Sequence, residues 1–143
     1  MKAISLTWQP RGAFHHVGFV VASIAASVKT FANSLQADWD EQIFHDPNQG
    51  VRVTFLVSRR EGDPLWELVE PADESSPVST LAEKGGGLHH ICYVVENLEQ
   101  AVAEARALGA LITRQPKPAV AFGGRRIAWI YTKNRLLIEY LER

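Results

Sequence analysis

This chain of 143 residues has one cysteine, no long apolar run and almost no net charge. The lone Cys92 excludes an internal disulfide and suggests a buried thiol in a reducing compartment, so we expect a cytoplasmic protein. No apolar run approaches the roughly 20 residues that span a bilayer. Residues 1–11 lack the apolar core of a signal peptide, so we expect no membrane partner. Fifteen Lys and Arg against sixteen Asp and Glu argue against nucleic acid as a partner.

The positive features begin with size and composition. With 46% hydrophobic and 22% charged residues, the chain lies in the ordinary globular range. It is long enough to bury one substantial core. We therefore expect a single domain over residues 1–143.

The most informative feature is an internal repeat. The apolar segment 14–21, with the sequence FHHVGFVV, returns as LHHICYVV over residues 88–95. Each copy is followed, after a nearly equal interval, by an apolar segment that contains one glutamate, Glu67 or Glu139. A duplicated unit is therefore expected, with one histidine-bearing strand and one glutamate-bearing strand in each half.

The pattern of apolar residues predicts the same order of elements in both halves. In the first half, the spacing predicts strands over 14–21, 38–45, 51–57 and 65–70, with a helix that begins after an N-cap at Ser23. In the second half, it predicts strands over 88–95, 110–113, 126–131 and 136–141, with a helix after an N-cap at Asn97. This gives two tandem βαβββ modules, over about 14–71 and 88–143. A connector, 72–87, joins them and contains one short helical piece near Val78.

The repeat also selects a set of metal ligands. Two imidazoles and two carboxylates form a credible four-ligand set for a divalent metal. The residues in this set are His16, Glu67, His90 and Glu139. A single such histidine is more often a hydrogen-bonded core residue, and a single such glutamate more often faces solvent, but their recurrence favours a site.

The alternation of side chains along a strand places a small residue beside each predicted ligand histidine. His16 shares a face with Gly18, and His90 shares one with Cys92, which leaves space beside each imidazole. By the same argument His15 and His89 face the other way, and we expect them to be surface or packing residues.

At these residues the chain resembles the vicinal-oxygen-chelate superfamily, and within it the methylmalonyl-CoA epimerases more than glyoxalase I. The segments that carry the resemblance are His15–Gly18, Gln49–Val51, Trp66–Pro71, Gly86–Ile91, Gly123–Ile127 and Leu137–Glu139. The resemblance implies an α+β fold in which two βαβββ modules form a cupped mixed sheet around a metal site. It assigns ligation to the same four residues and implies one divalent ion, of the Zn, Co, Ni or Mn type. It also implies a homodimer.

One position departs from the epimerase pattern. Where the epimerases carry a glutamate base, this chain has Asn48, whose amide cannot accept a proton at neutral pH. His45, Asp46 and Glu139 are alternative bases, the last by leaving the metal as a ligand glutamate is thought to do in glyoxalase I. We therefore name Glu139 and Asn48 as the catalytic positions.

The predicted chemistry is the removal of a proton α to a carbonyl in a small molecule, either an acyl thioester or a similar oxo compound. Residues Gly123, Gly124, Arg125 and Arg126 are candidates to bind a substrate carboxylate or phosphate, with a solvated turn as the alternative. A lyase of the glyoxalase I type is one alternative function. Sequestration of an antibiotic is another, with Phe55, Phe122 and Trp129 lining a pocket. A dioxygenase is less favoured, because it normally uses a single carboxylate ligand.

Overall fold

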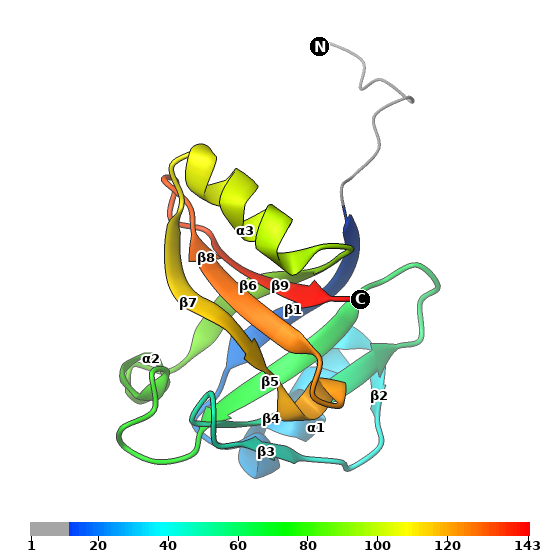
Figure 1. Cartoon of the computed structure of the whole chain (residues 1–143). Helices are drawn as coiled ribbons and strands as arrows, with labels where there is room; N and C mark the ends of the chain where they lie inside the picture. Colours follow the sequence, from blue (N-terminus) through cyan, green and yellow to red (C-terminus); the bar gives the residue numbers. More distant parts are fainter. Residues whose placement is uncertain (1–11) are drawn as a thin grey trace.

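In the computed structural model, residues 12–143 form one strongly curved mixed sheet with its two long helices on the outer side (Figure 1). Residues 1–11, for which the sequence predicts no signal peptide, lie outside the described part. The strands are β1 (Gly12–Val20), β2 (Ala37–Trp39), β3 (Phe44–Asp46), β4 (Val51–Ser58), β5 (Leu65–Pro71), β6 (Gly87–Val95), β7 (Leu111–Pro118), β8 (Arg126–Tyr131) and β9 (Leu137–Glu142). The helices are α1 (Ile24–Leu35), α2 (Ser79–Glu83), α3 (Leu98–Ala107) and the 3-10 turn η1 (Val120–Phe122).

The strand order shows the two modules side by side. The order is β2-β4-β5-β1-β6-β9-β8-β7, with β3 also paired to β4. In each half the histidine strand runs parallel to the glutamate strand, β1 to β5 and β6 to β9. The two histidine strands pair antiparallel to each other and join the halves. The predicted fold class, two βαβββ modules forming a cupped mixed sheet, is confirmed.

Alternating side chains divide each half into an outer core and an inner surface. Leu68 packs in one apolar cluster with Ile24 and Val28 of α1. Ala128 packs in the equivalent cluster with Leu98 and Val102 of α3. The helices thus cover the convex side of the sheet, and the neighbouring residues on β5 and β8 face the concave side.

Both long helices begin at the predicted caps. The side chain of Ser23 accepts a hydrogen bond from the Ala26 N–H, and that of Asn97 accepts one from the Gln100 N–H. Within residues 12–143, no helix is long and apolar enough to cross a membrane.

Two predicted strands have different bounds in the structure. The strand expected over 38–45 is divided into β2 and β3. The Asp40 carboxylate accepts the Gln42 N–H and Glu41 has a positive φ of 67°, so the chain turns outward between them. Strand β7 continues to Pro118 instead of stopping near residue 113. Because β7 is an edge strand, its prolines need no partner for a missing N–H.

Candidate metal and substrate site

The two predicted ligand histidines lie on the central strands, each opposite a small residue. His90 pairs with Gly18 across β1 and β6, and His16 pairs with Cys92. A Cβ atom at Gly18 would lie 2.1 Å from Cε1 of His90, so only glycine leaves room for this imidazole. The sequence placed Gly18 beside His16, whereas in the structure Gly18 leaves room for His90 of the neighbouring strand.

Each of the two glutamates pairs with the small residue of one of these pairs, which makes two cross-strand rows of three residues. Glu67 on β5 pairs with Gly18, and Glu139 on β9 pairs with Cys92. Each row therefore joins the glutamate of one module to the histidine of the other. The site is shared between the two halves of the chain.

The four side chains converge at short range. Nε2 of His16 lies 3.0 Å from Oε1 of Glu139 and 3.6 Å from Oε1 of Glu67. Nε2 of His90 lies 3.2 Å from Oε1 of Glu67 and 3.6 Å from Oε1 of Glu139. The two Nε2 atoms are 3.1 Å apart, and all four residues are at most 5% exposed.

This arrangement fits a divalent metal. Atoms that bind one ion at about 2.1 Å lie about 3.0 Å apart at an octahedral right angle and about 3.4 Å apart in a tetrahedron. Among the described residues the buried Oε1 of Glu139 makes no hydrogen bond of good geometry, and its close contacts are the Nε2 atoms of the two imidazoles, as for an oxygen that shares an ion with them. Two nitrogens and two carboxylate oxygens are the donors that zinc and its first-row neighbours accept.

The charges of the site are strongly coupled. Burial alone lowers the pKa of His90, but the carboxylates of Glu139 and Glu67 outweigh it and raise this pKa to about 9. Burial raises the pKa of Glu139, but the imidazoles of His16 and His90 outweigh this and lower it overall. Without metal, a proton on His90 thus balances part of the buried negative charge.

Two histidines expected to point away instead lie beside the ligands. The pairing of β1 with β6 skips His15 and, further along, His89, so each is the extra residue of a β-bulge. A bulge breaks the strict alternation of faces, which the prediction assumed. Nδ1 of His15 lies 2.8 Å from Nδ1 of His16. The second pair has the same distance between the Nδ1 atoms of His89 and His90.

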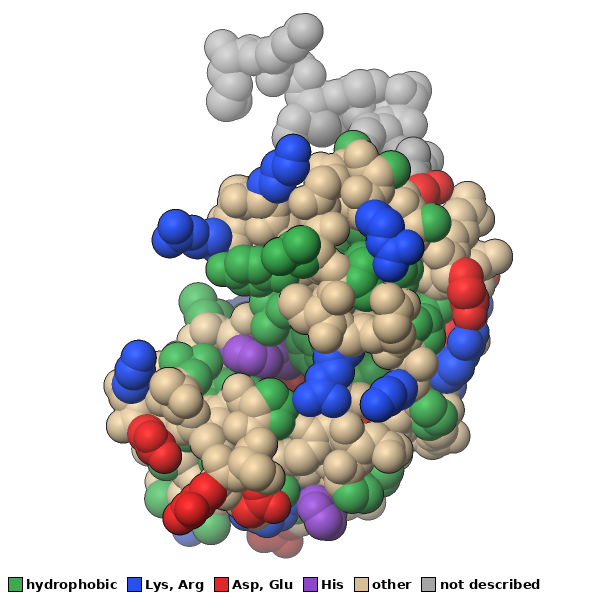
Figure 2. Space-filling model, turned by 60° about the vertical axis from the view of Figure 1, so that its left-hand side comes forward, with side chains coloured by type: hydrophobic (Ala, Val, Ile, Leu, Met, Phe, Trp, Pro, Cys, Tyr) green, Lys and Arg blue, Asp and Glu red, His purple; other side chains and the backbone are tan. Residues whose placement is uncertain are grey.

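A cavity opens above the four side chains, on the concave side of the sheet. Its volume is about 380 Å³. It is lined mainly by apolar side chains from both halves, together with Asp46, Gln49, Glu67, His89, His90, Thr113, Arg114 and Glu139. Figure 2 shows the hollow from one side, with a histidine inside it and Lys or Arg side chains beside it. Of the aromatic residues expected to line a pocket, Phe122 and Trp129 do so, whereas Phe55 packs against the ring of His16.

The predicted substrate residues lie outside this cavity. Gly123 and Gly124 form the turn after η1, both with positive φ. Nε of Arg125 donates to the carbonyl oxygen of Glu142 at 2.9 Å. Arg126 forms ion pairs with Glu142 and with Glu99 of α3, so its guanidinium is held on the helix side of the sheet.

The structure also places the other residues considered for proton transfer: His45 is exposed on β3 and does not line the cavity. Asn48 is exposed on the turn between β3 and β4, outside the cavity lining. Asp46 lines the cavity, but its Oδ1 accepts the N–H groups of Asn48 and Gln49, and its Oδ2 accepts that of Val120. The Asp46 carboxylate therefore ties η1 of the second module to the first.

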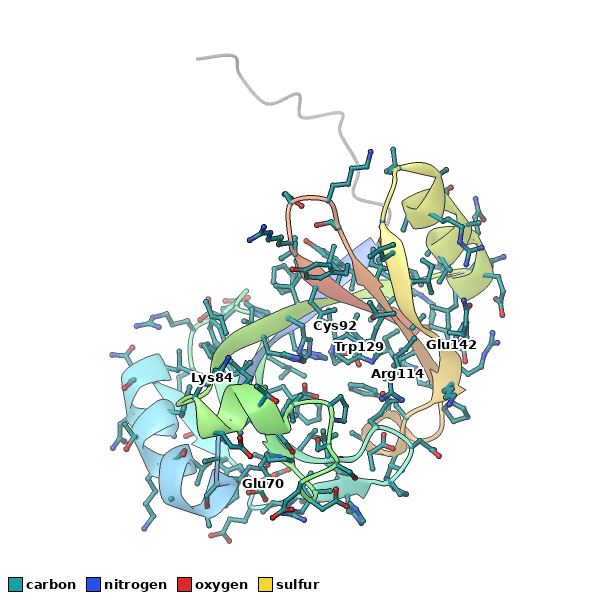
Figure 3. All side chains as sticks on the ribbon, turned by 90° about the vertical axis from the view of Figure 1, so that its left-hand side faces the viewer. Glu70, Lys84, Cys92, Arg114, Trp129 and Glu142 are labelled. Carbon is teal, nitrogen blue, oxygen red and sulfur yellow. The ribbon has the colours of Figure 1, made fainter. Side chains whose placement is uncertain are left out.

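Arg114 is the cavity residue that sequence analysis missed. It lies on β7 opposite Trp129, and Figure 3 shows the two side by side at the hollow, with Glu142 toward the outside. Among residues 12–143 it has no hydrogen-bond or ion-pair partner. Two register shifts in β7 break the alternation of side chains, so alternation does not predict where the Arg114 side chain points.

The fold and the shared site define a class of proteins. The chain belongs to the glyoxalase/bleomycin resistance protein/dioxygenase superfamily, whose sequence profile matches residues 15–129. Among its relatives is the ethylmalonyl-CoA/methylmalonyl-CoA epimerase of Cereibacter sphaeroides. It is 30% identical over 132 residues, which cover 90% of this chain and 96% of the relative.

Solved structures with a similar fold include two that illustrate the likeness. A hypothetical protein from Bacillus halodurans has a TM-score of 0.79 and 28% identity, with 94% of this chain and 96% of that chain covered. Streptomyces coelicolor methylmalonyl-CoA epimerase, in complex with 2-nitronate-propionyl-CoA, has a TM-score of 0.75 and 24% identity, with 93% and 98% covered. At that identity the second likeness supports the fold alone.

Proposed function

We propose that this chain is a divalent-metal-dependent epimerase that moves a proton at the carbon α to the carbonyl of an acyl thioester. The observation that carries the proposal is the convergence of four side chains, of which Glu67, His90 and Glu139 line a mainly apolar cavity and His16 is fully buried beside them. The kinship with an ethylmalonyl-CoA/methylmalonyl-CoA epimerase supports the choice of substrate class.

The same four residues hold the ion in this proposal. When bound, the ion stabilises negative charge on the carbonyl oxygen as the α-proton leaves. The apolar cavity wall excludes water, which strengthens every charge interaction inside. The buried position of the ligands keeps them in place before the substrate arrives.

Proton transfer falls to the carboxylates that line the cavity. Epimerisation removes the proton from one face of the α-carbon, leaving an enolate, and returns a proton to the other face. Asp46 is held by three N–H groups, and the exposed Asn48 cannot accept a proton at neutral pH. We therefore assign proton removal to Glu139 and proton return on the opposite face to Glu67, both of which line the cavity. The step starts with the proton on Glu67 and ends with the proton on Glu139, so only one of the two carboxylates would release the ion at any time.

Arg114 favours a substrate that also carries an anionic group. Within residues 12–143 it is the only Lys or Arg that lines the cavity, and its guanidinium has no partner there. Guanidinium groups bind carboxylates through two parallel hydrogen bonds. A carboxylated thioester, such as a malonyl-type thioester, satisfies this group and the metal site together.

Solvent-deuterium exchange tests the proposal. Purified protein is loaded with Co²⁺ or Zn²⁺, and deuterium entry at the α-carbon is followed for methylmalonyl-CoA, ethylmalonyl-CoA and uncharged acyl thioesters. We expect exchange with the carboxylated substrates and a loss of about 100- to 10,000-fold in Glu139→Gln. Metal-loaded protein that exchanges none of them contradicts the proposal. Turnover of a glutathione hemithioacetal instead indicates a lyase, and tight antibiotic binding without turnover indicates sequestration.

A further inference from the structure

His15 and His89 occupy equivalent places in the two halves. Each is the extra residue of a β-bulge and directly precedes a proposed metal ligand. Each is half-buried and packs edge-on against the ring that follows it, with ring centroids 5.1 Å apart for His15 and His16 and 5.0 Å for His89 and His90. A bulge at the same point in both copies turns an otherwise outward side chain toward the site twice.

Aromatic neighbours fix both bulged rings. His15 lies edge-on to Phe122, with ring centroids 5.5 Å apart. His89 lies beside Trp129 at 6.0 Å. Phe122 also stacks on His16, and Trp129 also packs edge-on against His90, so each aromatic ring contacts both histidines of its pair.

The tautomers follow from simple bonding rules. A neutral imidazole that gives its Nε2 lone pair to a metal carries its proton on Nδ1. In the described part of the chain, Nδ1 of His16 has only Nδ1 of His15 at hydrogen-bond distance, and Nδ1 of His90 likewise has only Nδ1 of His89. In each pair, one Nδ1 must therefore donate and the other must accept.

We infer that His15 and His89 are positioning residues that accept the Nδ1–H of His16 and His90, and so hold both ligand rings with Nε2 toward the metal. Ligand histidines in proteins usually donate this proton to a carboxylate, a backbone carbonyl or water. Here a second imidazole takes that place in both halves. The inference rests on the metal site of the proposed function.

Metal binding without substrate tests the inference. Metal-free His15→Ala, His89→Ala and the double variant are titrated with Co²⁺ against a competing chelator. We expect the Kd for Co²⁺ to rise about 10- to 100-fold in each single variant, the usual effect of losing such a support. His45→Ala, at an exposed histidine of β3, is the matched control and keeps the wild-type Kd. His89→Asn offers an amide oxygen as acceptor and recovers part of the affinity.

Nitrogen NMR of the Zn²⁺-loaded wild type gives a second readout, which does not depend on the variants folding. His15 and His89 should carry their protons on Nε2, and His16 and His90 on Nδ1. Unchanged Co²⁺ affinity in the variants, or protons on Nδ1 of His15 and His89, overturns this inference and leaves the metal site standing. Wild-type protein that binds no Co²⁺ overturns both.

Discussion

Replacing Gly18 by alanine tests the cross-strand row that places His90. The added Cβ would lie 2.1 Å from Cε1, 2.5 Å from Nδ1 and 2.6 Å from Nε2 of the imidazole. Ordinary van der Waals contact begins at 3.4 Å, so the ring has to move by about 1.3 Å or the strands have to part. Metal–ligand distances tolerate only about 0.2 Å. The His90 nitrogen would therefore leave the ion, and one of the proposed ligands would be lost.

We expect the Gly18→Ala protein to bind Co²⁺ at least about 100-fold more weakly than wild type, comparable to His90→Ala. The assay is a Co²⁺ titration followed by visible absorption, because the cobalt spectrum reports the number and geometry of the ligands. The matched control is Cys92→Ala at the equivalent position opposite His16. That change removes a sulfur and adds no clash, so Co²⁺ affinity should stay within a few-fold of wild type.

A Gly18→Ala protein with the wild-type Kd and cobalt spectrum would refute the reasoning, because His90 could then bind the ion from another position. Thermal unfolding of the metal-free protein separates a local effect from a global one. A cooperative transition near that of wild type, together with weak Co²⁺ binding, places the damage at the imidazole.

Three further predictions concern charge and hydrogen bonding. The metal-free protein holds a proton on His90 up to its pKa of about 9, and the ion must displace that proton. Co²⁺ affinity should therefore rise with pH and level off above about 9, and calorimetry in buffers of different ionisation enthalpy should show the proton release. Arg114→Gln should raise the KM for a carboxylated thioester about tenfold or more without changing the Kd for Co²⁺, whereas Arg60→Gln, at an exposed arginine outside the cavity, should change neither. Asp46→Ala removes the acceptor of three N–H groups and should lower the free energy of unfolding by about 3 kcal/mol in urea titrations; a loss no larger than that of the exposed Asp73→Ala would contradict the role given to this carboxylate.

The sequence alone predicts much of the site because the repeat carries information twice. The role of one histidine in an apolar strand is ambiguous. Two histidines, His16 and His90, at equivalent places in both copies favour a shared role as ligands. The same logic selects Glu67 and Glu139. Strand alternation places Gly18 beside His16 and Cys92 beside His90. In the structure each small residue lies opposite the histidine of the other strand.

The failures lie where a strand departs from strict alternation. His15 and His89 sit in bulges, and a single extra residue reverses the side to which a side chain points. Arg114 lies beyond the predicted strand 110–113, and the register shift before it in β7 also breaks the alternation of side chains. The alternation of side chains along one strand does not show how the neighbouring strand pairs with it. The ion pairs of Arg126 could not be predicted for a different reason, because its acidic partners Glu99 and Glu142 come from elements distant in the sequence.

The sharing of the site explains why these bulges lie where they do. Each cross-strand row joins a glutamate from one module to a histidine from the other, so neither half contains a complete ligand set. The antiparallel pairing of β1 with β6 therefore has to place both imidazoles at one point. A bulge in each strand shifts the register once on either side of that point, and the two ligand rings meet with their Nε2 atoms 3.1 Å apart. The same shifts that bring the ligands together also bring His15 and His89 behind them, so one distortion of the sheet builds both the proposed ligand set and its support.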